Sequence, residues 1–381
     1  MPKEKLVMIP GPTPVAAEIR GEMGREIQAF GDPRFVADYR ALIDGLGRLL
    51  NCSGQTFVVA GTGTLAMEMA IANVTKAGDR VLIVSHGFFG DRFIDICERK
   101  GLIVDVMQAE WGKIVPVKEI EAKLREHSYA AITVSHVDTA TGACAPIAEI
   151  GEMMKQFPDT IYIVDGVCAT AAEPEDVDGM NIDILFTGTQ KAFGVCPGLL
   201  MLWASKKAMA RRESLGTIPE YYVDFYKWLP VMEDTGKYFA TPAINLVWAL
   251  KKSLELIEAE GQENRQARHR KNARAMQAAL ETMGFTVLAD PACRAVTLSN
   301  VIYPDGIDDL KFRSALSEEG IVVAGGLAAY AGRMFRLGHM GNIDPGDMVT
   351  VLAAIERVLY GMGKLDELGM GVATYQKEMQ R

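Results

Sequence analysis

Short apolar runs that alternate with helical stretches constrain the fold of this chain more than any other feature. TFVVA is followed by LAMEMAIANV, RVLIV by DRFIDICERK, and YAAITV by IAEIGEMMKQF, and three further runs are IYIVD, IDILF and LLMLW. Strands that are apolar throughout are buried on both faces, and intervening helices bring consecutive strands into parallel register. The pattern predicts an α/β fold with a mainly parallel, doubly wound sheet.

The composition changes after Pro242. Residues 243 to about 283 are rich in Leu, Ala, Glu, Lys and Arg at helical period, interrupted by Gly261, which predicts a long connecting helix and a second helix after it. Beyond them, strand-like runs such as FTVLA, RAVTLSNVIY, GIVVA and RMFRL, with helices from about Asp308 and Pro345, predict a smaller α+β domain.

The proline-rich segment at residues 10–14 suits neither a helix nor a central strand, so we expect an extended arm there. We therefore expect three parts. These are an N-terminal arm at residues 1–20, a large domain at 21–245, and a connector helix with a small C-terminal domain at 246–381.

Charge and hydropathy exclude several classes of function. The formal net charge is -9, which gives a polyanion no general reason to bind, so we expect no nucleic-acid partner. The apolar runs are far shorter than the roughly 18 residues that cross a bilayer, so we expect no membrane span. The first residues lack the apolar core of a secretion signal, which predicts a cytoplasmic protein.

The six cysteines and five histidines are dispersed. No C-x-x-C pair occurs, and no two histidines have the spacing that binds zinc on a helix. We expect reduced thiols and no metal site.

Polar residues at the ends of the apolar runs are the candidates for chemistry, because ligands of doubly wound sheets bind beyond the carboxyl ends of the strands. Gly61-Thr62-Gly63-Thr64 follows the first run and leads into a helix, so its N–H groups and hydroxyls suit an anion such as phosphate. A plain turn is the alternative. After the second run, Gly87 and Gly90 bracket Phe88-Phe89, which suit either stacking on a flat ring or the core.

Three further runs end in polar residues. After YAAITV, a loop at residues 135–142 contains Thr139, whose hydroxyl could orient a ligand, and His136, which alone reads better as a structural histidine. Asp165 ends IYIV, and a buried carboxylate there needs a cation or N–H donors. Lys191 follows IDILF in a short turn, where a lysine can act as a nucleophile toward carbonyls, although most lysines are simply solvated.

In this order, the set resembles fold-type I pyridoxal-phosphate enzymes, and in detail it resembles their class V aminotransferases, especially alanine–glyoxylate and serine–pyruvate aminotransferases. The resemblance spans nearly the whole chain and implies pyridoxal 5'-phosphate as cofactor. The turn Gly61 to Thr64 would hold the phosphate, and Phe89 would stack on the ring where many relatives have tryptophan. Thr139 would place a hydroxyl near the ring, and Asp165 would pair with the pyridine nitrogen. In the Gln190-Lys191 pair, Lys191 would form the Schiff base.

The resemblance also implies how substrate and a second subunit take part. Gly11 matches the family's Pro-Gly-Pro arm at the substrate site, and Arg336 matches the arginine that grips the substrate α-carboxylate. Tyr238 and Thr241 match a Tyr-x-x-Thr-Pro segment that reaches the phosphate of the neighbouring subunit. We therefore expect a homodimer with shared active sites, and we expect the arm at residues 10–14 to lie on the partner.

The implied reaction is ping-pong transfer of an amino group from a small amino acid, alanine or serine, to glyoxylate or pyruvate. Phe30 to Phe35 differ from the family's usual Gly-His-Arg-Ser stretch. If Arg34 lies in the pocket, a donor with a distal acid, such as aspartate or aminoethylphosphonate, is the alternative.

Two other classes remain open. A cysteine desulfurase or lyase is suggested by His136-Val137, although Gln190 stands where desulfurases have histidine and Cys293 precedes an apparent strand. The other class is a non-catalytic relative that keeps the fold as a structural or binding subunit. The joint presence of Lys191, Asp165 and Arg336 argues against it.

Overall fold

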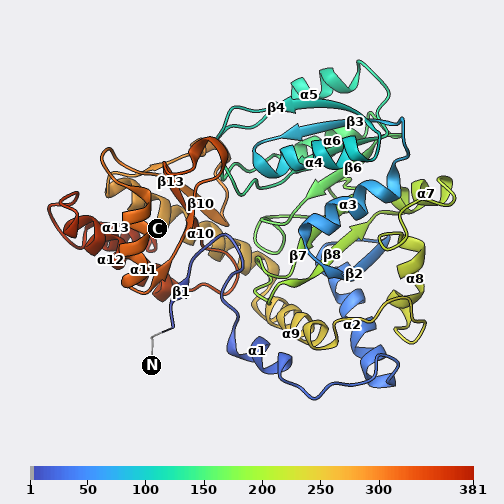
Figure 1. Cartoon of the computed structure of the whole chain (residues 1–381), viewed down its shortest axis with the longest axis horizontal. Coiled ribbons are helices and arrows are strands. Elements are labelled where there is room, and N and C mark those ends of the chain that lie inside the picture. The colour runs from blue at the N-terminus through green and yellow to red at the C-terminus, as the bar shows by residue number, and fades with distance from the viewer. Residues whose placement is uncertain (1–3) are drawn as a thin grey trace.

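A seven-stranded sheet forms the centre of the computed structural model, which describes residues 4–381 (Figure 1). The spatial order of its strands is β2-β8-β7-β6-β5-β3-β4. Their bounds are β2 (Gln55–Gly61), β3 (Arg80–Ser85), β4 (Ile103–Gln108), β5 (Ala131–Ser135), β6 (Ile161–Asp165), β7 (Ile184–Gly188) and β8 (Gly198–Ala204). Only β8 is antiparallel to its neighbours, β2 and β7, so β2 runs in the same direction as the remaining strands. The predicted, mainly parallel sheet is confirmed.

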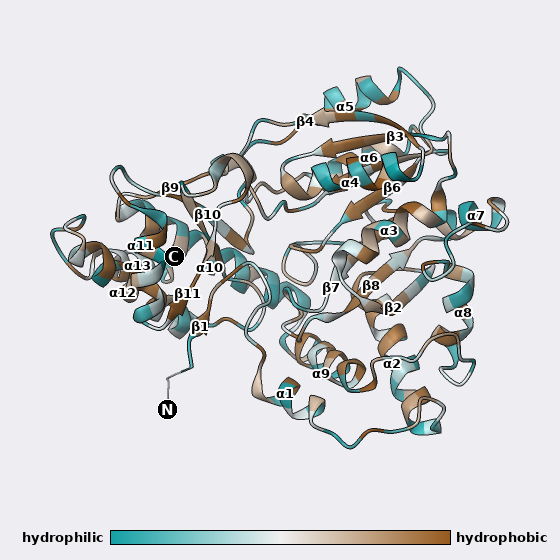
Figure 2. Cartoon of the chain, in the orientation of Figure 1, coloured by the Kyte–Doolittle hydropathy of each residue, from teal (hydrophilic) through white to brown (hydrophobic). Residues whose placement is uncertain are grey.

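Nine helices in the first 260 residues of the described chain accompany this sheet. They are α1 (Ala17–Met23), α2 (Pro33–Leu49), α3 (Gly63–Val74), α4 (Phe88–Arg99), α5 (Val117–Leu124), α6 (Ile147–Met154), α7 (Lys206–Ser214), α8 (Phe225–Glu233) and α9 (Ile244–Glu260). Helix α3 packs on β7 and β8, and α4 packs on β3 and β4. In Figure 2 the strands β3, β6 and β8 are brown, whereas α5 and α7 carry much teal, as expected for buried strands and solvent-facing helices.

A smaller antiparallel sheet lies in the C-terminal part, with the order β12-β13-β10-β9. Its strands are β9 (Thr286–Val287), β10 (Leu298–Ile302), β12 (Ala324–Gly325) and β13 (Met334–Gly338). The accompanying helices are α10 (Gln262–Thr282), α11 (Asp309–Glu318), α12 (Pro345–Gly361) and α13 (Met370–Glu378), with 3-10 turns at Pro291–Cys293 and Ala328–Tyr330. These elements enclose a second hydrophobic core. The predicted connecting helices correspond to α9 and α10, which are separated by Gly261.

The N-terminal arm packs on its own chain, so it does not need a partner subunit as its surface, and a contact with a partner stays a prediction. Strand β1 (Leu6–Val7) pairs in parallel with β11 (Ile321–Val322) of the C-terminal part. The chain then passes the end of the central sheet and enters α1, which packs against α9 (Figure 1). Backbone hydrogen bonds along the arm, such as Met8 N–H to Val322 O at 2.8 Å, satisfy its polar groups within the chain.

The central sheet contains one strand that was not predicted. Strand β4 was missed, because IVDVMQ at this sheet edge is partly exposed and lacks a continuous apolar run. No helix separates β6 from β7, where turns span residues 166–183 instead. Within residues 4–381, no helix combines the length and apolar character needed to cross a membrane.

Candidate active site

Most of the residues predicted to bind the cofactor meet at one edge of the central sheet, where β2, β3, β5, β6 and β7 end. These strands share one direction, so the segments that follow them converge on the same side. A cavity of about 220 Å³ lies there. Its walls are formed by Thr62, Gly63, Thr64, Met67, Phe89, Arg92, Val137, Thr139, Asp165, Val167, Cys168, Gln190 and Lys191.

The start of α3 forms one wall. Thr62 is the N-cap residue but its side chain makes no capping bond, and no group within residues 4–381 bonds the N–H of Gly63, Thr64 or Leu65. A Cβ at Gly63 would lie 2.8 Å from Val167 Cγ2, so only glycine allows this close approach of α3 to the turn after β6. The free N–H groups and the helix dipole make this wall suited to an anion. Gly61 is the last residue of β2, directly before this wall.

Phe89 is held in a second wall by Asp138, a residue that the sequence analysis did not single out. Asp138 Oδ2 accepts hydrogen bonds from Phe89 N–H at 2.9 Å and Gly90 N–H at 3.2 Å. Gly87 has φ +158°, and a Cβ on it would lie 2.7 Å from Asp138 Oδ1. Burial raises the pKa of Asp138, against the lowering effect of these N–H donors. Asp138 therefore fixes the start of α4, and with it the position of Phe89.

Asp165 ends β6 at the floor of the cavity and is 5% exposed. Val167 N–H donates to its Oδ1 at 2.9 Å. Burial raises the pKa of Asp165 to about 7, and the nearby Asp138 and Glu175 act in the same direction, while Val167 N–H and Lys191 oppose it. This carboxyl group is thus poised to gain or lose a proton near neutral pH, and a cation in the cavity would hold it ionised.

Lys191 lies in the turn after β7, beneath the arm. Its Nζ donates to Pro10 O, and Thr13 Oγ1 donates to Lys191 O at 2.8 Å. Gly11 has φ +97°, and a Cβ there would lie 2.5 to 2.9 Å from the Cδ, Cε and Nζ atoms of Lys191. Glycine is therefore required where the arm crosses the lysine amine.

Two further polar groups face the cavity. The Oγ1 atom of Thr139 lies 2.7 Å from Cys168 Sγ. Gln190 Oε1 is buried without a hydrogen-bond partner among the described residues. A buried acceptor without a partner is costly, so a ligand donor or water at this position would stabilise the site.

Arg336 belongs to the small sheet and is not among the residues that form the cavity walls. It lies on β13, and its Nε donates to Gly325 O at 2.8 Å. Burial lowers the pKa of its guanidinium, while Cys168, which lines the cavity, and Asp138 act to raise it. The structure thus places this predicted carboxylate-binding arginine within electrostatic range of Cys168.

Three residues highlighted by the sequence lie away from the cavity. Tyr238 is 57% exposed, and its hydroxyl oxygen lies 3.4 Å from Thr241 Oγ1. The Arg34 side chain is 76% exposed and pairs with Asp32, the N-cap residue of α2, at 3.2 Å. Within one chain, none of these three side chains reaches the cavity.

Arg92 is a cavity residue that the sequence analysis missed. The predicted helix began at Asp91, whereas α4 begins at Phe88, which places Arg92 one turn after Phe89 on the same helix face. The sequence did contain a signal for Arg92, because Phe89 and Arg92 have the i, i+3 spacing of neighbours on a helix face. Its interpretation depended on where the helix begins.

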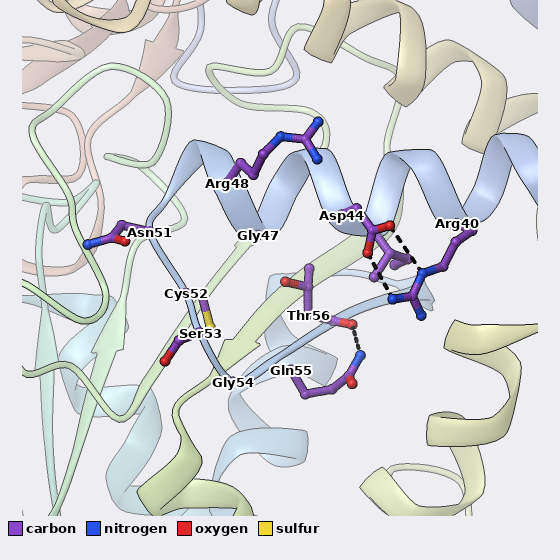
Figure 3. Close-up of a pocket in the computed structure, with 11 residues that line it drawn as sticks. Arg40, Asp44, Gly47, Arg48, Asn51, Cys52, Ser53, Gly54, Gln55 and Thr56 are labelled. Carbon is purple, nitrogen blue, oxygen red and sulfur yellow. Dashed lines mark hydrogen bonds and ion pairs between the residues drawn. The ribbon is translucent and has the colours of Figure 1, made fainter.

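A larger hollow of about 500 Å³ lies elsewhere, between α2 and β2 (Figure 3). Dashed lines in Figure 3 join Arg40 to Asp44 and Gln55 to the backbone of Thr56. Arg40 pairs with Asp44 at 3.1 Å, and Gln55 Nε2 donates to Thr56 O at 2.7 Å. None of the residues predicted for chemistry lines this hollow, so the cavity at Lys191 is the candidate active site.

Comparison with known proteins agrees with this geometry. An uncharacterised aminotransferase of Methanocaldococcus jannaschii is 37% identical over 374 residues, covering 97% of both chains. L-aspartate–glyoxylate aminotransferase of Paracoccus denitrificans is 31% identical, covering 100% of this chain and 98% of its own, and serine–glyoxylate aminotransferase of Hyphomicrobium methylovorum is 31% identical, covering 96% and 92%.

Solved structures show the same similarity. Ureidoglycine–glyoxylate aminotransferase of Bacillus subtilis superposes with a TM-score of 0.95 at 25% identity, covering 100% of this chain and 99% of its own. Alanine–glyoxylate aminotransferase of a Nostoc species superposes with a TM-score of 0.90 at 31% identity, covering 94% and 96%. The family model for class-V aminotransferases matches residues 20–343. This chain therefore belongs to the class-V aminotransferase family, with the fold-type I architecture.

Proposed function

We propose that this enzyme transfers the amino group of a small amino acid, alanine or serine, to glyoxylate or pyruvate by a ping-pong mechanism. The observation that carries the proposal is the meeting of Lys191, Asp165 and the free start of α3 around one cavity. The names of the relatives support glyoxylate as acceptor, because four of them are glyoxylate aminotransferases. A matrix of amino donors and oxo-acid acceptors, measured on the purified protein, tests the proposal directly.

The cavity fits pyridoxal phosphate, the cofactor that the family implies. An amine, a carboxyl group and a helix start with free N–H groups line the same space, and the buried Gln190 Oε1 lacks a partner among the described residues. Thr62, Gly63 and Thr64 would hold the phosphate, Phe89 would stack on the ring, and Thr139 would hydrogen-bond at its edge. The bound cofactor would supply an aldehyde and a protonated ring that withdraws electrons from the substrate α-carbon.

The chain's own residues then have separate tasks. Asp165 holds a proton on the ring nitrogen, because the ionised carboxylate is stabilised by the adjacent positive charge. Lys191 Nζ would accept the α-proton of the amino acid and would later donate a proton again, so that one amine serves as both base and acid. Arg336 binds the α-carboxylate and thereby sets which bond of the α-carbon faces Lys191. The arm excludes water over Lys191 through the close packing of Gly11.

A donor with a distal acid is the second candidate, because the aspartate–glyoxylate relative covers the whole of this chain. Such a donor needs a second cation in the substrate pocket, since a buried unpaired carboxylate costs several kcal/mol. Arg34 is exposed and paired with Asp32 in its own chain. We therefore favour the small donor.

The donor preference is testable in kcat/KM. In the wild-type enzyme we expect kcat/KM for alanine or serine to exceed kcat/KM for aspartate by about 100-fold or more, because the side-chain carboxylate of aspartate would be buried without a cation. We expect Arg34→Ala to leave this ratio unchanged within about twofold. A wild-type preference for aspartate that disappears in Arg34→Ala would establish the distal-acid donor and leave the transaminase assignment intact.

A homodimer with shared active sites is the second part of the proposal. Tyr238 and Thr241 are remote from the cavity of their own chain, and the Tyr238 ring is largely exposed, so they are available to a partner. We expect Lys191→Ala and Thr241→Ala homodimers each to be strongly impaired. Mixed hybrids should recover activity, because one of their two sites then carries both intact residues. Sedimentation of the wild type as a fully active monomer would contradict this part.

The desulfurase alternative has little support from the geometry. Cys293 is 7% exposed in a 3-10 turn, and its Sγ lies 3.5 Å from Gly112 O. Burial raises the pKa of this thiol, which disfavours the reactive thiolate. Release of sulfide from cysteine by the purified enzyme, at rates comparable to transamination, would reverse this preference.

A further inference from the structure

We propose that Arg92 is the cation that binds the cofactor phosphate within a single chain, held in place by Thr64 and Phe89. The inference rests on the proposed function, since it presumes that pyridoxal phosphate occupies the cavity. It assigns a binding role to a residue of α4, whereas the predicted phosphate site consists of the start of α3 and two residues of a partner.

The contacts of Arg92 place its charge beside the start of α3. Its Nη1 donates to Thr64 Oγ1 at 2.9 Å, and Thr64 is the second residue of α3. Its Cζ lies 4.7 Å from the centre of the Phe89 ring. Among residues 4–381, no carboxylate lies within 4.0 Å of this guanidinium. A half-buried arginine without a counter-ion therefore shares the cavity with the free N–H groups of a helix start.

Charge balance within the cavity favours phosphate as the missing partner. The phosphate of the cofactor is a dianion near neutral pH, and helix N–H groups supply only partial charges to it. Lys191 is the other cation that lines the cavity, and its amine is directed to Pro10 O at the arm. An arginine stacked on an aromatic ring is pre-organised to present its remaining N–H groups to a phosphate oxygen.

A distal acid of the substrate is the competing ligand for Arg92. Arg92 is bonded to the helix that starts at the phosphate wall, whereas Arg336, the predicted carboxylate ligand, comes from β13 of the small sheet and bonds Gly325 O. The two arginines are thus tied to different parts of the fold. The hydrogen bond from Arg92 to Thr64 places the arginine at the start of α3, which favours the cofactor phosphate over a substrate acid as its ligand.

The test compares cofactor binding with and without the phosphate. Apoenzyme of wild type, Arg92→Gln and Arg92→Lys is titrated with pyridoxal phosphate and with pyridoxal, and the dissociation constants are measured by absorbance. We expect Arg92→Gln to weaken pyridoxal phosphate binding roughly 10- to 100-fold, the range of a charge-assisted hydrogen bond, and to change pyridoxal binding less than about twofold. Arg92→Lys, which keeps the charge, should fall between the two.

A matched control comes from the same helix. Arg99→Gln removes an exposed arginine that pairs with Asp95, and both dissociation constants should match those of the wild type. Inorganic phosphate should also compete with pyridoxal phosphate for the wild-type apoenzyme, and less effectively for Arg92→Gln. Circular dichroism of the apo forms checks that the variants fold. If Arg92→Gln does not fold, Arg92→Lys provides the comparison with the wild type.

Three outcomes would overturn the assignment. Equal weakening of both ligands would mean that Arg92 only supports the Phe89 ring. Unchanged binding of both would mean that the phosphate is held without Arg92. Unchanged binding together with a selective loss of kcat/KM for aspartate would assign Arg92 to a substrate acid. Failure of the wild type to bind pyridoxal phosphate at all is a separate result, which would reject the proposed function instead.

Discussion

Lys191→Ala is expected to lower kcat for transamination by at least about 10³-fold, because the substitution removes both the nucleophile and the base that moves the α-proton. In the wild type, borohydride should reduce the bond between the cofactor aldehyde and the lysine and leave the label on one peptide. That peptide should contain Lys191, the lysine that lines the cavity beneath the arm. Peptide mapping by mass spectrometry and steady-state kinetics check the two halves of the prediction.

Lys118→Ala provides the control, because Lys118 is an exposed residue on α5. It should keep wild-type kinetics and the label on the Lys191 peptide. Label on another lysine, or a Lys191→Ala enzyme that still transaminates, would reject the assignment of Lys191.

Asp165→Asn is expected to lower kcat by roughly 100- to 1,000-fold, since it removes the fixed negative charge that stabilises a protonated ring in the transition state. Affinity for pyridoxal phosphate should fall by a smaller factor, about tenfold or less, because the start of α3 and Lys191 still bind the cofactor. Parallel measurement of kcat and of the cofactor dissociation constant separates the two effects. Full activity in Asp165→Asn would contradict the role given to this carboxylate.

The same variant has a pH-dependent effect on the stability of the apoenzyme. Burial raises the pKa of Asp165 to about 7, above its ordinary value of 3.8. A raised pKa means that the stability contributed by this group is fully present below the unfolded value and is lost as the pH rises through 7. Relative to wild type, apo Asp165→Asn should therefore gain on the order of 2 to 3 kcal/mol in unfolding free energy between pH 5 and pH 8.5.

Urea denaturation at both pH values measures this gain. Asp95→Asn is the control, because it makes the same substitution at an exposed carboxylate that pairs with Arg99. A difference between Asp165→Asn and wild type that stays constant with pH would mean that Asp165 is ionised in the apoenzyme at pH 5.

The central sheet and its functional edge follow from the sequence because fully buried strands leave continuous apolar runs. Asp165 and Lys191 could be located because each comes directly at or after such a run. Strand β4 could not be recognised in the same way, because Asp105 interrupts it at the exposed edge and pairs there with Arg80 at 2.9 Å.

Contacts between segments that are distant in the sequence could not be predicted from the sequence patterns. Asp138 caps the start of α4 from the loop after β5, a contact between residues 48 and 49 positions apart. To place Arg92 in the cavity, one must know where α4 begins and that α3 lies beside it. The spacing of apolar residues in the sequence gives neither. The packing of the arm on its own chain was missed for the same reason, because β1 and β11 join residues more than 300 positions apart.

The strand pairings also determine when the site can form during synthesis of the chain. Strand β2, which leads into the free start of α3, pairs only with β8 in its sheet, so it has no neighbour until the ribosome has released residues up to Ala204. The arm over Lys191 packs later still, because β1 can pair with β11 only after Ile321–Val322 have been synthesised. Loop-closure entropy makes such distant pairings late events in folding. The arm is thus translated before the sheets but is among the last segments to pack, and a nascent chain that lacks its C-terminal part exposes the lysine without its arm.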